Sequence, residues 1–197
     1  MPKKSIAKNY LYNLTYQILI LILPLITTPY LSRVLGAEGI GIYSYTYTIV
    51  TYFVLFGSLG VSLYGQREIA YAQDHRGKRK KIFIELVVFR FITIAVAVVI
   101  YYFTFMRTGA YSVYYRILIF ELIAGAFDIS WFFQGLEEFK KTVTRNILVR
   151  LISVALIFIM VKKQSDLITY MYIYSLADLI GNLSLWIYLP RYLKGVK

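Results

Sequence analysis

Long apolar stretches separated by short polar segments dominate the chain. No charged residue occurs between Lys8 and Arg33 or between Glu38 and Arg67, and a third stretch, 167–189, contains a single charge. A helix that crosses the roughly 30 Å hydrocarbon core of a bilayer needs about 20 mainly apolar residues. Three further stretches have a suitable length but contain isolated charges. The pattern predicts six transmembrane helices, over about 8–31, 40–64, 82–105, 112–135, 143–162 and 167–190.

The short connections between these helices predict a single bundle in which sequential helices are antiparallel neighbours. The longest connection is a predicted loop over 65–81, and Gly36, Gly39 and Gly41 are expected in the turn between the first two helices. Pro24 and Pro29 are expected to kink or end that first helix, because proline removes a backbone donor. We therefore expect an all-α integral membrane protein in which residues 1–197 form one six-helix membrane domain.

Composition supports this class and excludes others. Hydrophobic residues make up 59% of the chain, which excludes a soluble domain and leaves no room for a separate soluble catalytic domain. The first apolar stretch is longer than that of a signal peptide and no small-residue cleavage site follows it, so we expect the first helix to be retained.

The distribution of positive charge predicts the orientation in the membrane. The net charge is +12, and with the N-terminus inside, 15 of the 22 basic residues fall on that side and 5 on the other. By the positive-inside rule, both termini are expected in the cytoplasm. The basic run 75–81 is interpreted as a topology signal that touches anionic lipid headgroups. The expected partners of these charges are membrane lipids, not nucleic acid.

Polar and charged residues also occur within the predicted helices, where the bilayer makes them costly and where they usually face a bundle interior or a water-filled cavity. Their spacing places them on one face of each helix. We therefore predict a hydrated cavity; the alternative is that these groups hydrogen-bond to one another between helices, which contributes under about 1 kcal/mol on average. The candidate residues are Gln17, Arg90, Glu121, Asp128, Asn146, Arg150, Asp178 and Asn182.

The residue types indicate the chemistry that such a cavity could support. Arg90 and Arg150 stay charged and present paired donors that match phosphate, so they indicate an anionic ligand or acidic partners. Asp128 or Asp178 could instead carry a proton or bind a coupling cation. The chain has no cysteine and one histidine, His75, and it shows no catalytic constellation. We expect no metal centre, no cofactor and no enzymatic activity.

Three segments carry a resemblance to a known family. They are PYLSRVLGAEGIGIY at 29–43, GVSLYGQREIA at 60–70, and WFFQGLE at 131–137 followed by RN at 145–146. Together they resemble the N-terminal part of Wzx-type polysaccharide or O-antigen flippases, which belong to the superfamily of oligosaccharide-lipid flippases and multidrug exporters. The resemblance covers nearly the whole chain.

The resemblance implies a function and a cellular location. Such proteins move undecaprenyl-diphosphate-linked oligosaccharides across the bacterial inner membrane for lipopolysaccharide O-antigen, capsule or exopolysaccharide assembly. It implies a cationic cavity with Arg90 and Arg150, with Asn146 on the same helix face as Arg150, and it places Arg33 near an outer gate. Full members have about twice as many helices in two lobes. We expect this chain to be the N-terminal lobe of a two-lobe flippase, with a second lobe supplied by the same gene or by a separate chain, since one lobe cannot alternate access.

Three other functions remain open. A related exporter of small cations would depend on Glu121, Asp128 and Asp178 rather than on the arginines. A non-transporting membrane fragment that interacts with glycan-assembly proteins would tolerate neutralisation of the interior charges. An enzyme acting on a lipid-linked sugar is disfavoured because no catalytic cluster is present.

Overall fold

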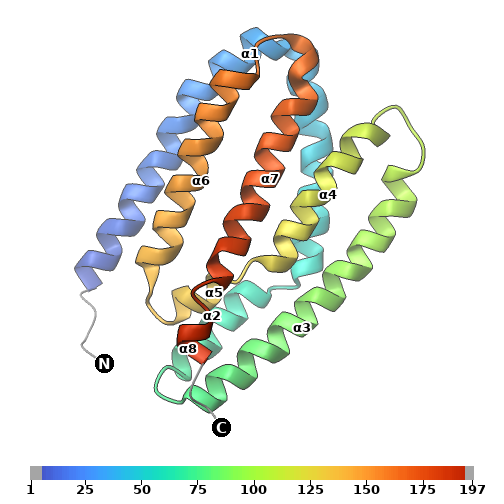
Figure 1. Cartoon of the computed structure of the whole chain (residues 1–197). Coiled ribbons are helices and arrows are strands. Elements are labelled where there is room, and N and C mark those ends of the chain that lie inside the picture. Colours follow the sequence, from blue (N-terminus) through green and yellow to red (C-terminus); the bar gives the residue numbers. More distant parts are fainter. Residues whose placement is uncertain (1–5, 194–197) are drawn as a thin grey trace.

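A computed structural model describes the backbone of residues 6–193 and, within it, the side chains of residue 11 and of residues 14–193. This part of the chain contains helices and no strands, which confirms the predicted all-α fold (Figure 1). Of the basic residues used to predict the orientation, Lys3, Lys4, Lys194 and Lys197 lie outside the described residues, as does the side chain of Lys8. The elements are α1 (Ile6–Ser58), α2 (Val61–Tyr71), α3 (Arg76–Tyr101), the π-helix η1 (Tyr102–Met106), α4 (Ser112–Phe127), α5 (Ser130–Gly135), α6 (Phe139–Met160), the 3-10 helix η2 (Gln164–Asp166), α7 (Leu167–Trp186) and α8 (Pro190–Leu193).

Four helical segments are long and apolar enough to cross a membrane. They are Leu14–Tyr71, Arg76–Met106, Ser112–Gly135 and Phe139–Met160. The chain is thus a multi-pass membrane protein. The first segment contains both predicted spans 8–31 and 40–64. Helix α7, which covers most of the predicted span 167–190, is not among the four, because tyrosines and the polar residues of its second half lower its hydropathy.

Helix α1 is interrupted at Gly36, where the backbone has φ 71° and ψ 173°. This combination is essentially restricted to glycine, because a Cβ atom would clash with the backbone. The first helical limb therefore ends at Gly36 and not near Pro29, and both Pro24 and Pro29 lie inside it. Proline is tolerated in membrane helices when the neighbouring structure accommodates the lost hydrogen bond.

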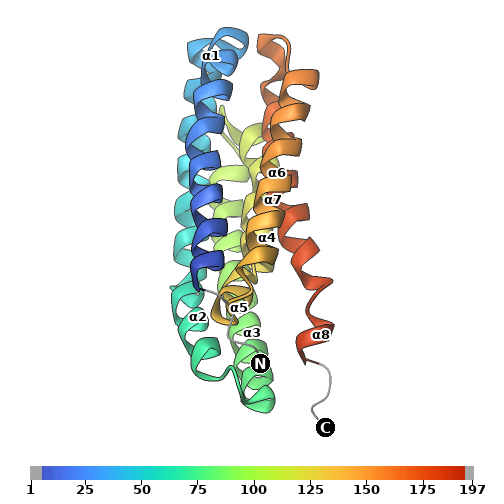
Figure 2. The same ribbon diagram turned by 90° about the vertical axis from the view of Figure 1, so that its left-hand side faces the viewer.

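The two limbs of α1 meet at the Gly36 turn and diverge toward the other end of the bundle, where α6 and α7 lie between them in the view of Figure 1. Figure 2 shows the bundle from the side of the first limb. The first limb packs near α6: the Tyr30 hydroxyl donates to the backbone oxygen of Val161 at 2.7 Å. The second limb packs on α3, where the Thr93 hydroxyl donates to the backbone oxygen of Gly57 at 2.5 Å. Helix α7 packs against both α4 and α6. Helices α2, α5 and α8 gather at one end of the bundle, and the Gly36 turn and η2 lie at the other (Figure 1).

One predicted loop is wrong, and one predicted helix keeps its two ends but contains a break. The segment 65–81 is not a loop, because α2 extends to Tyr71 and α3 already begins at Arg76. The predicted helix 112–135 is divided into α4 and α5 at Asp128, whose backbone is extended with φ −72° and ψ 107°. The Asp128 side chain accepts the backbone N–H of Ser130 at 2.9 Å, which satisfies a donor outside the helix and so favours the break.

Two of the segments that carry the family resemblance, 60–70 and 131–137, meet where α2 packs on α5. A Cβ atom on Gly65 would lie 2.5 Å from Cε3 of Trp131, and one on Gly135 would lie 2.6 Å from the backbone oxygen of Gln66. Glycine at both positions therefore allows the two short helices to touch. Phe132 and Phe133 are fully buried in the same apolar cluster. The resembling segments thus form a packing unit that fixes the end of the bundle beside Asp128.

Candidate functional site

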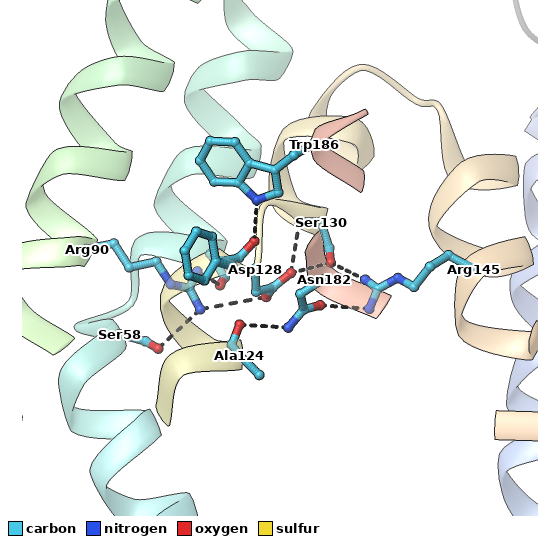
Figure 3. Close-up of polar contacts among 10 residues, drawn as sticks. Ser58, Arg90, Ala124, Asp128, Ser130, Arg145, Asn182 and Trp186 are labelled. Atoms are coloured by element: carbon cyan, nitrogen blue, oxygen red, sulfur yellow. Dashed lines mark hydrogen bonds and ion pairs between the residues drawn. The ribbon is translucent and has the colours of Figure 1, made fainter. Parts of the chain in front are cut away.

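A buried ion pair joins α3 to the break between α4 and α5. An Arg90 Nη atom lies 3.7 Å from Oδ2 of Asp128, and the two side chains are 4% and 27% exposed. The Arg90 guanidinium also donates to Ser62 at 3.1 Å and to Ser58 at 3.3 Å (Figure 3). The pair lies where the helix break turns the carboxylate of Asp128 into the bundle. The sequence predicted both residues as candidates, and the structure brings them together.

A second arginine extends this network to α6 and α7. Arg145 donates to the Ser130 hydroxyl at 2.8 Å and to Oδ1 of Asn182 at 2.7 Å. Ser130 in turn donates a short hydrogen bond to Asp128, and the Asn182 amide donates to the backbone oxygen of Ala124 at 2.7 Å. Figure 3 shows the resulting chain of polar groups from Arg90 to Arg145.

Arg145 was missed as a site residue. It lies in the resembling segment 145–146, but its position near the start of the fifth predicted helix placed it among the cytoplasmic charges. The adjacent Asn146 was predicted instead. Asn146 is half-buried, and within the part of the chain that the structure describes its side chain makes no hydrogen bond. The signal that could have found Arg145 is its place in the segment 145–146, which carries the family resemblance.

A second charged cluster lies deeper along the same helices. Glu121 is 9% exposed and interacts electrostatically with Asp178 and Arg150. The Arg150 guanidinium lies 4.8 Å from the ring centre of Tyr174, in a cation–π arrangement. Glu121 is two helical turns from Asp128, so this cluster is about 10 Å from the first along α4. The structure thus gathers three of the predicted acidic and basic residues from α4, α6 and α7.

A cavity of about 150 Å³ adjoins this second cluster between the first limb of α1, α6 and α7. Arginine, serine, threonine and tyrosine side chains reach its wall among aliphatic ones. The cavity therefore has the mixed polar and apolar lining that a small polar group or water would need. Pro24 of α1 also lines this wall. The residues that contribute polar side-chain atoms to it are Thr27, Arg150, Ser153, Tyr170 and Tyr174.

Two predicted residues lie outside both clusters. Gln17 is exposed on the first limb of α1. Arg33 is also exposed and lies three residues before the Gly36 turn, at the end of the bundle opposite α5 (Figure 1). Within residues 14–193, neither side chain forms a hydrogen bond or ion pair with Arg90, Arg145 or Arg150.

The charge arrangement favours anions. Within residues 6–193, the carboxylate that lies within 4.0 Å of an interior arginine is that of Asp128, beside Arg90. Arg145 is held by neutral acceptors and Arg150 by an aromatic face. A guanidinium that lacks a contacting carboxylate retains donors and charge for a phosphate or another anion.

These features define a multi-pass helical membrane protein with a charged interior. The chain matches the family described as polysaccharide biosynthesis protein over residues 6–197, and it belongs to that family. The resemblance drawn from the sequence is thereby confirmed.

Two curated relatives agree with this assignment. The chain is 29% identical over 184 residues to a protein of Escherichia coli (strain K12) provisionally named an O-antigen transporter, with 92% of this chain and 44% of that protein covered. A protein of Shigella dysenteriae with the same provisional name is 27% identical over 170 residues, with 85% of this chain and 42% of that protein covered. The chain thus spans under half the length of these relatives. No solved structure matches it.

Proposed function

We propose that the chain is the N-terminal lobe of a flippase that moves undecaprenyl-diphosphate-linked oligosaccharides across the bacterial inner membrane for surface polysaccharide synthesis. Membership of the polysaccharide biosynthesis family and the provisional names of the relatives support a transporter of this class. The coverage of under half of each relative supports a lobe that works with further helices. These come from the same gene or from a separate chain.

The observation that carries the proposal is the line of interior arginines. Arg145 and Arg150 occupy one helix, five residues apart, and within residues 6–193 neither has a carboxylate within 4.0 Å. Arg90 continues the line across the bundle through Asp128 and Ser130. A diphosphate presents two anionic centres a few ångströms apart, which such a line of guanidinium groups suits.

We further propose six spans, with each limb of α1 and α7 crossing the bilayer and both termini in the cytoplasm. The basic residues in the first turns of α3 and of α6 lie at the same end of the bundle, near α8 (Figure 1). The positive-inside rule then places that end in the cytoplasm. Arg33 lies at the opposite end, which suits a role near an outer gate.

The deeper carboxylates are proposed to couple transport to an ion. Glu121 and Asp178 interact with each other and with Arg150 in a bundle interior. An unpaired carboxylate charge is costly at this depth in a membrane. Binding a proton or a cation neutralises the charge and so lowers that cost. Binding of an anion at Arg150 would change the charge that these carboxylates experience, which links the two events.

Complementation tests the proposal. In a strain that lacks its O-antigen flippase, the full gene product that contains this chain should restore surface polysaccharide. Arg145→Gln and Arg150→Gln should each reduce it about tenfold or more, because a charge-assisted hydrogen bond contributes about 1.5–3 kcal/mol. Arg116→Gln is the matched control, since Arg116 is exposed and contacts the backbone oxygen of Met106.

The amount of surface polysaccharide is compared only among variants that reach the membrane in equal amounts, as measured by immunoblot. Restoration by Arg145→Gln and Arg150→Gln at the level of the unchanged protein would overturn the proposed anion site. Selective loss with Glu121→Gln or Asp178→Asn, and none with the arginine variants, would show that transport depends on the carboxylates and not on an anion site. No restoration by the unchanged protein would favour the exporter of cations instead.

A further inference from the structure

A groove runs along the outside of the bundle between α6 and α7, on a different face from the interior clusters. It consists of two adjoining hollows, of about 560 Å³ and about 440 Å³. Both are lined by Val149, Ile152 and Ile180, so they form one continuous groove. We call this the α6–α7 groove.

One end of the α6–α7 groove is basic. Lys140, Lys141 and Arg145 line it, and no acidic residue does. Lys141 forms an ion pair with Glu138 at 3.3 Å, and Arg145 is held by neutral acceptors. The Lys140 side chain is exposed. Three cations therefore meet one nearby carboxylate, which leaves the end of the groove positively charged.

The remainder of the groove is apolar and open to the side. Large aliphatic side chains there are strongly exposed: Ile152 is 57%, Met160 is 50% and Ile180 is 65% exposed. From Val149 to Met160 the groove follows α6 for about 16 Å, at about 1.5 Å per residue. This length matches the roughly 15 Å thickness of one leaflet of the hydrocarbon core.

We propose that the α6–α7 groove binds an anionic membrane phospholipid. Its phosphate lies among Lys140, Lys141 and Arg145, and one acyl chain lies along the apolar part. A helix from another protein would fill the apolar part but would not need cations at one end only. Basic pockets between membrane helices on the cytoplasmic side are suited to anionic headgroups. The groove opens to the outside of the bundle and shares Arg145 with the proposed anion site.

The site also reaches the interior network. Arg145 lines the groove and at the same time donates to Ser130 and Asn182. A phosphate at the groove would therefore contact the residue that connects α6 to the Asp128 break. The lipid would stabilise this connection whether or not the chain transports a substrate, so the inference does not depend on the proposed function.

Lipid binding to the purified chain, measured by native mass spectrometry, tests the inference. Phosphatidylglycerol should bind at least about tenfold more tightly than phosphatidylcholine with identical acyl chains, because each lysine near an anionic headgroup favours it. Lys140→Glu should remove this preference. Lys140 makes no contact in the described part of the chain, so the variant should fold normally. The matched control is Lys78→Glu, an exposed lysine at the same end of the bundle but outside the groove.

A second variant tests the apolar part. Ile180→Trp fills the groove without changing its charge, and it should weaken the binding of both lipids about equally. Equal affinity for the two lipids, or an unchanged preference in Lys140→Glu, would overturn the inference. The inference would also be overturned if undecaprenyl phosphate bound more tightly than phosphatidylglycerol, displaced it, and lost this binding in the same variants. The groove would then be a site for the carrier lipid. None of these outcomes depends on transport, so they leave the complementation result independent.

Discussion

At the scale of single residues, the Arg90–Asp128 pair is the contact on which the helix break depends. Asp128 accepts hydrogen bonds from the backbone and the hydroxyl of Ser130 and also faces Arg90. Its removal leaves a buried guanidinium without its anion, and such a loss costs more than the pair contributed. The break between α4 and α5 and the position of Arg145 both follow from this carboxylate.

Asp128→Ala should lower the free energy of unfolding by about 1–3 kcal/mol, the range for hydrogen bonds to a charged group. Reversible unfolding in mixed micelles would measure it. Glu85→Gln is the control, because Glu85 lies 3.8 Å from Lys81 with both side chains more than half exposed, and an exposed pair contributes about 0–1 kcal/mol. An equal effect of the two substitutions would contradict a special role for Asp128.

Asp166 provides a test by pH outside the membrane-spanning segments. The backbone N–H groups of Lys162 and Lys163 donate to its Oδ2 at 2.9 and 3.1 Å, and these bonds lower the pKa of the carboxyl. The folded-state pKa is therefore below the unfolded one. The stabilisation is fully present above the unfolded pKa and is lost as pH falls through the folded pKa. Carboxyl NMR should give Asp166 a midpoint below about 3.9; a midpoint at or above that value would contradict the contacts.

Sequence reasoning at this scale used depth in a helix as its signal. Arg90, Glu121, Asp128, Arg150 and Asp178 were predicted because charge within an apolar helix needs a partner, and the structure brings them together in two clusters. Arg145 was not found, because charge near a helix end is ordinary. Its partners come from α5 and α7, which no pattern within α6 reveals.

At the scale of helices, the short pair α2 and α5 holds the end of the bundle. Gly135→Ala should lower the free energy of unfolding by about 1–3 kcal/mol, because the new Cβ atom would lie 2.6 Å from the backbone oxygen of Gln66. Gly41→Ala is the matched control: nothing lies within 4 Å of its Cβ position, so a gain of up to about 1 kcal/mol is expected. Similar changes at both glycines would contradict the close approach.

Helix boundaries were the weaker part of the prediction. Apolar length predicted the long helical segments, but it did not separate α4 from α5, because residues 130–135 contain neither a charge nor a proline that would mark a break. The break depends on one side chain accepting a backbone N–H, and α2 depends on tertiary packing with α5. Of the three glycines predicted in the first turn, Gly36 is there because its positive φ needs glycine, but Gly39 and Gly41 already lie in the second helical limb of α1, so that part of the prediction was wrong.

At the scale of the whole molecule, the account predicts that the end with α2, α5 and α8 faces the cytoplasm. The chain has no cysteine, so single cysteines can report sidedness without background. Ser165→Cys, in η2, should react with a membrane-impermeant maleimide in spheroplasts. Lys78→Cys, at the start of α3, should react only after lysis. Reaction of both positions from the same side would contradict an odd number of crossings between them.

The central claim is that this lobe helps to move a lipid-linked oligosaccharide across the membrane. The most direct measurement uses vesicles that contain the full gene product and an undecaprenyl-diphosphate-linked oligosaccharide, and follows the fraction of sugar that an added glycosidase cleaves. The account predicts that this fraction rises with time beyond the sugar exposed at the outset, and that Arg150→Gln slows the rise about tenfold or more. A fraction that stays at the level of protein-free vesicles would contradict it.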